Sequence, residues 1–338
     1  MEYHIIVKDI TGNTLGEFDR FSNLRYKSVL NREGDCSFQI NLKDDKATNA
    51  FIALGVRDVY IYRDDDIAWG GRMWNYHGRV PRDDCMLTVT LSGFLKMLKK
   101  RCIYTKESYT SIDAGQLAWN LINISQGKPY GDMGITQGTL ETTFLLNEDI
   151  EYTTLYDELL KLSGTKPGFD LEITQTKVFN VYTKKGTDKS DTIIFNLDKN
   201  IDELELNGDF ENTANEFCVQ GSGYGEAMAK SIRSDTNLQA SYGLLQRIVP
   251  LKNTFDQTQL DAYGDQQLLY YGLPSRQYTI QNNPLSEPDL TELQPGDWVR
   301  VQAQYGNFVN LYDVVRLSAI EVTYDGGLEY VKPTFLYA

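Results

Sequence analysis

Polar and apolar residues alternate regularly in two short runs of the first hundred residues. Apolar side chains occupy every second position of residues 36–42 and 85–91, and the positions between them are polar except for Met86. This period of two is typical of a β-strand with one buried and one wet face. The apolar set is Cys36, Phe38, Ile40, Leu42, Cys85, Leu87, Val89 and Leu91, and the polar set is Ser37, Gln39, Asn41, Thr88, Thr90 and Ser92.

A hairpin over residues 58–73 is the clearest pairing signal in the sequence. The β run Asp58–Tyr62 stops at the charged turn Arg63–Asp66, and the second β run contains the pair Gly70–Gly71. Further turn signals at residues 31–34 and 81–84 separate the other β runs. Several antiparallel strands at this spacing predict a small barrel or sandwich over residues 1–102.

The pattern becomes helical after residue 101. Residues 111–125 and 154–164 carry leucine and isoleucine at helical spacing, with Asp113 and Thr154 as suitable N-caps and Gly164 as a stop. A glycine-rich stretch at residues 127–138 is expected to be a loop, and a hairpin is expected over residues 169–183. We therefore expect an α/β insert over residues 103–200.

The remaining residues return mostly to β patterns. Residues 201–230 read as strands, and a further helix is expected over about residues 256–271, where its apolar stripe is mixed. Residues 281–293 form a polar linker, and Asp325–Gly327 is the turn of a last hairpin. These signals place a second β domain in residues 201–230 and 294–338, with a helix-containing insert and linker at 231–293. The predicted class is mainly β (α+β).

Length and charge limit the classes of function. The chain has 338 residues, which is too long for a single hydrophobic core and suggests two or more domains. Its formal net charge is −14. A protein that grips nucleic acid should be basic, so specific nucleic-acid binding is not expected. Two readings of the negative charge stay open, which are simple solubility and a surface past which DNA slides without sticking.

Cysteine and histidine are scarce. Cys36, Cys85, Cys102 and Cys218 are widely spaced, which favours small core side chains in a reducing compartment over disulfides or zinc. His4 and His77 are the two histidines, too few for most metal or general-base sites. We expect no catalytic residue, metal or cofactor. A secretory signal and a membrane span are not expected either.

Local motifs for chemistry are incomplete. Gly221–Gly225 has Ala229 where a phosphate-binding loop needs glycine before its lysine, so a turn is the better interpretation. Asp64–Asp66 lacks the spacing of a calcium loop and reads as a solvated turn. The basic cluster at residues 96–101 is interpreted as a solvated face or an inter-subunit ion-pair site, with a phosphate contact as the alternative. No local signal selects an acid pair for glycoside hydrolysis.

The order of four segments resembles the hub proteins of bacteriophage tails, also called baseplate or tail-tip hubs. The segments are the β region Phe21–Leu42, the hairpin Val59–Asp64 leading to Trp69–Arg72, the helix and hairpin Leu155–Tyr182, and Leu293–Val299. The likeness of each segment alone to this family is weak, and the combination and order of the four segments are more specific.

The resemblance implies two tube-like antiparallel β-barrels interrupted by smaller modules, in a homotrimeric ring that adapts the tail tube to the tip. It also implies other tail proteins as partners (a distal tail or tube ring, a tape-measure protein, and a spike or fibre), assembly in the host bacterial cytoplasm, and residence in the virion. DNA would pass through without specific binding. The six polar residues of the alternating runs then face either the lumen or outside solvent. A cell-wall hydrolase and a carbohydrate-binding adhesin of the tail tip are the alternative functions.

Overall fold

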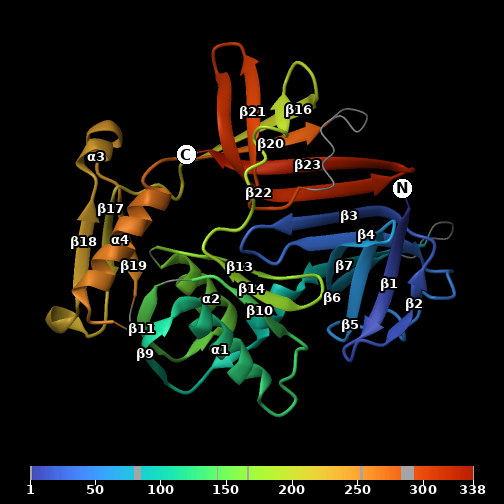
Figure 1. Cartoon of the computed structure of the whole chain (residues 1–338), viewed down its shortest axis with the longest axis horizontal. Coiled ribbons are helices and arrows are strands. Elements are labelled where there is room, and N and C mark those ends of the chain that lie inside the picture. The colour runs from blue at the N-terminus through green and yellow to red at the C-terminus, as the bar shows by residue number, and fades with distance from the viewer. Residues whose placement is uncertain are drawn as a thin grey trace.

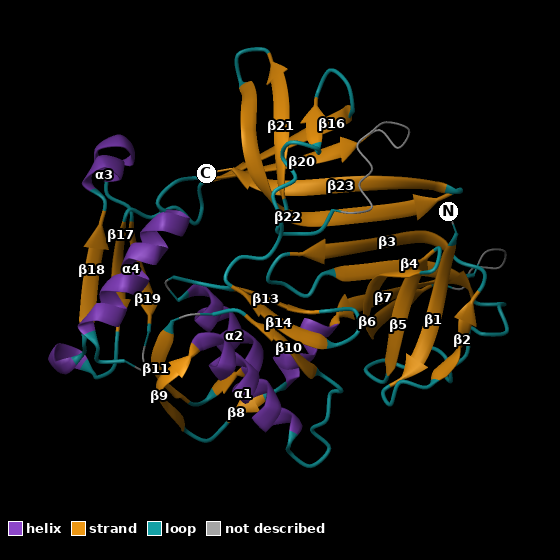
Figure 2. Ribbon diagram, in the orientation of Figure 1, coloured by secondary structure: helices purple, strands orange, loops and turns teal. Residues whose placement is uncertain are grey.

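The structure is a computed structural model that describes residues 2–79, 85–142, 144–165, 167–251, 254–282 and 293–337. The turn expected at residues 81–84 and most of the linker expected at 281–293 lie outside the described residues. Strands predominate in Figures 1 and 2, as the alternating sequence pattern predicts. None of the described helices is long and apolar enough to cross a membrane.

Two groups of strands build most of the molecule. The first β region contains β1 (Tyr3–Asp9), β2 (Thr14–Phe18), β3 (Ser22–Val29), β4 (Asp35–Asn41), β5 (Arg57–Arg63), β6 (Asp66–Gly78) and β7 (Met86–Gly93). The last β region contains β15 (Ile194–Asn196), β16 (Ile201–Asp209), β20 (Ser275–Asn282), β21 (Trp298–Tyr305), β22 (Val309–Asp325) and β23 (Leu328–Tyr337). The turn predicted at Asp325–Gly327 joins β22 to β23.

Two smaller parts interrupt these regions. The helical insert contains β8 (Cys102–Ile103), β9 (Glu107–Asp113), α1 (Ala114–Gln126), β10 (Thr136–Leu140), β11 (Leu145–Ile150), β12 (Thr153–Thr154), α2 (Leu155–Gly164), β13 (Asp170–Ile173) and β14 (Val178–Tyr182), and it follows the 3₁₀ helix η1 (Phe94–Lys100). The side module contains β17 (Glu216–Gln220), η2 (Gly225–Ala227), β18 (Lys230–Ser234), α3 (Thr236–Tyr242), β19 (Gln246–Pro250) and α4 (Gln257–Tyr271).

Both β regions belong to one 13-stranded sheet. Its main path runs β16-β20-β23-β22-β3-β4-β7-β6-β5-β1-β2, and β21 pairs with β22 and β15 beside that path. Every pairing on the main path is antiparallel, and the path is open at both ends, so the described strands do not close into a barrel. Residues 201–230 are divided between two sheets, because β16 lies in the large sheet and β17 lies in the sheet of the side module. Strand β20, which follows the side module in the sequence, lies in the large sheet again.

The two β regions repeat one topology, a likeness that the sequence does not demonstrate. Strands β3, β4, β5, β6 and β7 correspond in order to β16, β20, β21, β22 and β23. In each set the fourth strand is long: its first half pairs with the third strand and its second half pairs with the fifth. The fifth strand pairs with the second, and the second with the first. The sets are joined where β3 pairs with β22, at the centre of Figure 1.

A continuous hydrophobic core lies beneath both β regions. It joins side chains of β1 to β7, such as Phe18 and Phe38, to side chains of the last β region, such as Phe195 and Phe335. The predicted buried residues Cys36, Phe38, Ile40, Val89 and Leu91 all belong to this core, and all are fully buried. The alternation in the sequence therefore assigned the buried face of β4 and β7 correctly.

The predicted helices begin at the expected capping residues. Asp113 accepts hydrogen bonds from the backbone of Gly115 and Gln116 at the start of α1, and Thr154 accepts one from Asp157 at the start of α2. The helix expected near residues 256–271 is α4, which begins after its cap Asp256. The hairpin expected over residues 169–183 is β13 and β14.

One local prediction was wrong in part. Strand β10 begins within the glycine-rich stretch expected to be a loop, because residues 136–140 pair in parallel with β14. Strand β14 lies about forty positions later in the chain, so no local pattern announces this pairing. The short helix α3 also has no stripe of buried residues that would predict it.

Candidate functional site: the polar face of the large sheet

The six polar residues of the alternating runs lie together on one face of β4 and β7. Ser37 stands opposite Thr90, and Gln39 stands opposite Thr88. The Gln39 amide nitrogen donates a hydrogen bond of 3.2 Å to the Thr88 hydroxyl. Asn41 is exposed at the end of the row, whereas Ser92 is buried and accepts a 2.9 Å hydrogen bond from Lys96 Nζ. The sequence therefore grouped these residues correctly, with Ser92 at a covered edge.

Strands β3 and β22 extend this face into the last β region. Arg25 stands opposite Ser37 on one side and opposite Thr323 on the other. Its guanidinium binds Asp35 of β4, and its Nη2 lies 2.8 Å from a Glu321 carboxylate oxygen of β22. Burial opposes the charge of Arg25, but the two carboxylates outweigh it and raise the pKa of the guanidinium. One arginine thus ties the two β regions together on the polar face.

The face continues across β23, β20 and β16. Lys332 stands opposite Glu321, and Thr279 of β20 shares a 3.2 Å hydroxyl contact with Thr334 of β23. On β16 the side chains of this face are Glu203, Glu205, Asn207 and Asp209, all exposed. Sequence reasoning missed the part of the face beyond β4 and β7. The alternation of Arg25 and Lys27 with Leu24 and Tyr26 is the signal in β3 that would have found it.

A partly buried polar cluster joins β1, β3 and β5 to β23 beneath the face. Arg63 holds Glu329 with two hydrogen bonds, of 2.9 and 3.1 Å, and the Tyr3 hydroxyl donates to the same carboxylate. Tyr3 also contacts the hydroxyl of Tyr26 at 3.1 Å. Burial first, and then the charges and hydrogen bonds around it, raise the pKa of Tyr3 well above its usual value. Tyr3 and Tyr26 therefore stay neutral, and their hydroxyl groups link the strands through hydrogen bonds.

A second buried cluster fixes the helical insert to the first β region. Asp58 of β5 is 1% exposed and lies 2.7 Å from Arg72 Nε and 2.5 Å from Lys177 Nζ. Lys177 comes from the turn between β13 and β14, where its φ of 62° is in the left-handed region. One carboxylate thus neutralises a cation from the neighbouring strand β6 and a cation from the distant turn between β13 and β14.

A third cluster anchors the insert to both β regions. Asp170 of β13 binds Arg316 of β22 and accepts a 2.8 Å hydrogen bond from the side chain of Asn31. It also accepts the backbone N–H of Lys185 at 2.7 Å. Because these partners come from three separate segments, Asp170 fixes the place where the parts of the chain meet.

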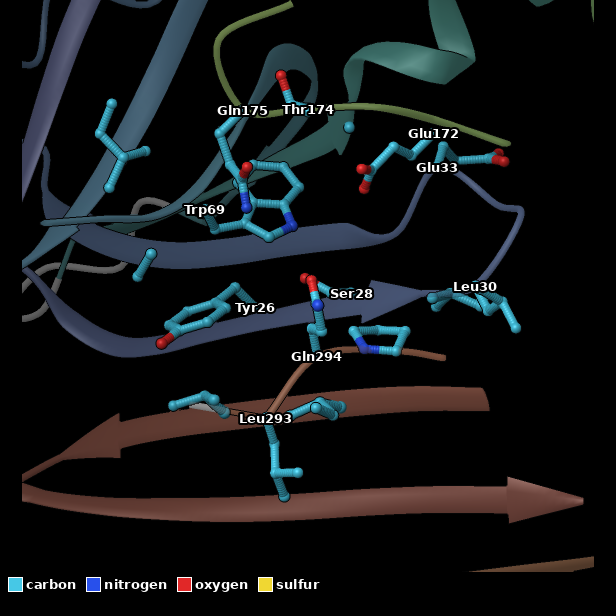
Figure 3. A pocket seen from close by; sticks show the side chains of 18 of the residues that line it. Tyr26, Ser28, Leu30, Glu33, Trp69, Glu172, Thr174, Gln175, Leu293 and Gln294 are labelled. Carbon is cyan, nitrogen blue, oxygen red and sulfur yellow. The ribbon is translucent and has the colours of Figure 1, made fainter. Parts of the chain in front are cut away.

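A cavity of about 690 Å³ lies at this meeting place, on the core side of the sheet. Figure 3 shows Trp69, Thr174 and Gln175 on one side of the space, with Leu293 and Gln294 on the other. Glu33 and Glu172 add acidic groups to the lining. The described lining contains neither histidine nor cysteine, so it offers no nucleophile activated by a neighbouring imidazole. The cavity is the seam between the β regions and the insert.

The other sequence motifs take structural roles. Gly221–Gly225 forms part of the connection from β17 to β18, as the interpretation as a turn requires. Asp64, Asp65 and Asp66 are exposed at the tip of the β5–β6 hairpin. His4 pairs with Glu17 at 2.6 Å, which raises the pKa of the imidazole. Among the described residues, no group of three or more His, Cys, Asp or Glu side chains is placed to hold a metal ion.

The basic cluster at residues 96–101 also contacts its own chain. Lys99 lies 2.6 Å from Glu33, and Arg101 donates a 2.8 Å hydrogen bond to the carbonyl of Gly131. Burial opposes ionisation of Glu33, but Lys99 and the Tyr156 hydroxyl outweigh it and lower the pKa of that carboxyl group. These contacts hold η1 and the residue after it against the turn between β3 and β4 and against the insert.

Comparison with known proteins gives structural matches. No family model matches the chain, and no curated protein matches it. A 43 kDa tail protein of prophage MuSo2 from Shewanella oneidensis aligns over 99% of this chain and 98% of its own, with TM-score 0.70 and 12% identity. The tail protein from Neisseria meningitidis MC58 aligns over 99% and 96%, with TM-score 0.68 and 14% identity.

A third match comes from a secretion machine. The E. coli c3393 protein, described as a type VI secretion component similar to the T4 tail proteins gp27 and gp5, aligns over 98% of this chain and 77% of its own. Its TM-score is 0.55 at 12% identity. These likenesses extend over nearly the whole chain, and at such identities they establish a shared fold. The chain has the fold of bacteriophage tail proteins, and it resembles the gp27-like component of tails and type VI secretion systems.

Proposed function

We propose that this chain is a structural protein of a bacteriophage tail, the distal tail or baseplate hub, which forms a homotrimeric ring around a passage for DNA. The observation that carries the proposal is the polar face of the large sheet. It runs without a break across both β regions and is backed by one core. A sheet of this kind is suited to lining a water-filled channel, because one face is wet and the other is packed.

The proposed architecture is two tube-like units with inserted parts. The first unit is residues 1–102 and the α/β insert is residues 103–200. The second unit is residues 201–230 and 294–338, with β15 and β20 added to it and with β17 assigned to the helix-containing insert. The rest of 231–293 forms that insert and the linker. The repeated topology supports this division, because each β region supplies the same five-strand arrangement. Three chains with two units each would give the six similar units that a sixfold tube requires.

In this proposal Ser37, Gln39, Asn41, Thr88 and Thr90 face the lumen, and Ser92 lies at the covered edge of their row. Uncharged hydroxyl and amide groups offer DNA no strong contact. The acidic side chains of β16 and the net charge of −14 repel phosphates. Such a surface favours passage over binding.

The partners in the proposal are other tail proteins: a distal tail or tube ring, a tape-measure protein, and a spike or fibre. The protein would be assembled in the host bacterial cytoplasm and would reside in the virion at the tail tip. The role is structural and needs no cofactor and no catalysis.

Light scattering and negative-stain imaging of the purified chain test the proposal. The expected result is a mass three times that of the 38.5 kDa chain, with ring-shaped particles. A strict monomer over the whole range of concentration would contradict the trimeric ring. Zymography on purified peptidoglycan tests the alternative of a cell-wall hydrolase, because clearing by this chain alone would contradict a purely structural role.

A further inference from the structure

The polar-faced part of the large sheet has an open backbone edge at each end. At one end β16 pairs with β20, and among the described strands none pairs with its other side. At the opposite end, residues 74–78 of β6 pair with β7 and have no described strand on their other side, because β5 stops opposite Arg72. An unpaired strand edge is a template for pairing with another chain.

The chain already contains a joint that shows how such edges meet. In the repeated topology β16 corresponds to β3, and β6 corresponds to β22. Strands β3 and β22 pair with each other inside the chain from Leu24 to Val29. The two open edges are therefore the counterparts of two edges that are joined, and the same rotation that relates the two β regions would bring β16 of one copy onto β6 of the next.

Strand direction agrees with this joint. From β16 to β6 the sheet has eight strands in the order β16-β20-β23-β22-β3-β4-β7-β6, and every neighbouring pair is antiparallel. An even number of alternating strands makes β16 and β6 run in opposite directions, so a second copy continues the antiparallel pattern. A head-to-tail contact of this kind generates a ring when its rotation closes.

The charges on the two edges are complementary. On the polar face β16 presents Glu203, Glu205 and Asp209, and residues 201–211 contain no basic side chain. The β6 edge presents Asn75 and His77 on that face, and the exposed Arg79 follows in the next position of the same alternation. Antiparallel pairing places the start of β16 beside the end of β6, which brings Glu203 and Glu205 near His77 and Arg79.

Apolar side chains support the same contact on the opposite face. Tyr76 is 53% exposed and Leu206 is 40% exposed, although both occupy core-facing positions of their strands. At the internal joint the corresponding face pairs Tyr26 with Val322, and both are buried. A neighbouring strand would remove Tyr76 and Leu206 from water in the same way.

We propose that copies of this chain join through antiparallel pairing of the β16 edge of one copy with residues 74–78 of β6 of the next. This inference rests on the proposed ring and names the surfaces that close it. Glu203 and Glu205 face His77 and Arg79 of the neighbouring copy across the joint, and the polar face becomes continuous around the ring.

A charge exchange between the two edges tests the joint. The first variant combines Glu203→Lys with Glu205→Lys, the second combines His77→Glu with Arg79→Glu, and the third carries all four changes. The control combines Asp65→Lys with Glu226→Lys, which makes the same change of net charge as the first variant at two exposed positions away from both edges. Light scattering gives the mass of each assembly, and circular dichroism and thermal melting check that each chain is folded.

The expected result is loss of the trimer in the first and second variants and its recovery in the third, because the third restores opposite charges across every joint. The control keeps the trimer. Edge variants that stay trimeric, or a folded third variant that stays monomeric, would overturn the β16–β6 joint while leaving the ring itself intact. A wild-type chain that never assembles would overturn the ring and the joint together.

Discussion

Buried carboxylates hold distant segments of this protein together at the level of single residues. Asp58, Asp170 and Glu329 each bind a cation from another part of the chain, and their side chains are at most 11% exposed. Removing such charges from water is costly, and the cost is offset only while the partners stay in place. These residues therefore fix where the parts of the chain sit more than they add to net stability.

Asp58 gives the sharpest test at this scale. The change Asp58→Asn keeps the shape of the side chain but leaves Arg72 and Lys177 buried without their counter-charge. We expect the free energy of unfolding to fall by about 3–5 kcal/mol. Urea unfolding followed by tryptophan fluorescence measures the loss. The matched control Asp65→Asn, at an exposed turn, is expected to change it by less than about 0.5 kcal/mol, and an equal effect of both changes would refute the role of the buried cluster.

At the scale of elements, β6 and β22 are the pieces that shape the sheet. The first half of each strand pairs with β5 or β21, and the second half pairs with β7 or β23 in the polar-faced part of the sheet. This change of partner along one strand carries the sheet from the β5 or β21 side to the polar-faced strands without a break in the chain. It also leaves the end of β6 uncovered, whereas the equivalent part of β22 is covered by β3.

The position of the polar face in the assembly follows from these elements. We expect a gold cluster attached at Thr90→Cys to appear in the central opening of the imaged ring, because Thr90 lies in the middle of the polar row of β7. Cys102 and Cys218 are changed to serine first, while Cys36 and Cys85 are buried. The chain without the added cysteine should bind no gold. Gold on the outer rim of the ring would place the face toward outside solvent.

Secondary structure in this protein was predicted best where a local signal specifies it. Asp113 and Thr154 mark helix starts because a side-chain oxygen caps the free backbone N–H groups, which is a local interaction. Strand β10 was missed because its partner β14 lies far along the chain. The side module was only partly predicted, since its small core depends on α4 packing on β17 and β18.

At the scale of the whole molecule, the net charge of −14 governs how the protein meets DNA. Non-specific binding to duplex DNA depends on basic groups that release counterions, with dissociation constants of about 10⁻⁴–10⁻⁶ M for proteins that bind in this way. We expect no change in the fluorescence anisotropy of a labelled duplex up to about 10 μM protein at about 150 mM salt. Saturable binding that weakens with added salt would contradict a surface built for passage.

The sequence alone determined the local features of this protein. The period-two alternation identified the buried and wet faces of β4 and β7, because side chains of a strand point to opposite sides in turn. The caps located the helices, and the acidic composition argued against binding of nucleic acid. The polar row Ser37, Gln39, Thr88 and Thr90 was therefore readable before any contact between strands was known.

Only the tertiary structure decided how these pieces repeat and where they end. The pairing of β3 with β22 joins residues almost three hundred positions apart, and no local pattern encodes such a partner. The matched topology of the two β regions and the open edges of β6 and β16 follow from that pairing. The physical reason is that strand pairing is made by backbone groups common to every residue, so side-chain patterns specify which face is buried but not which strand is the neighbour.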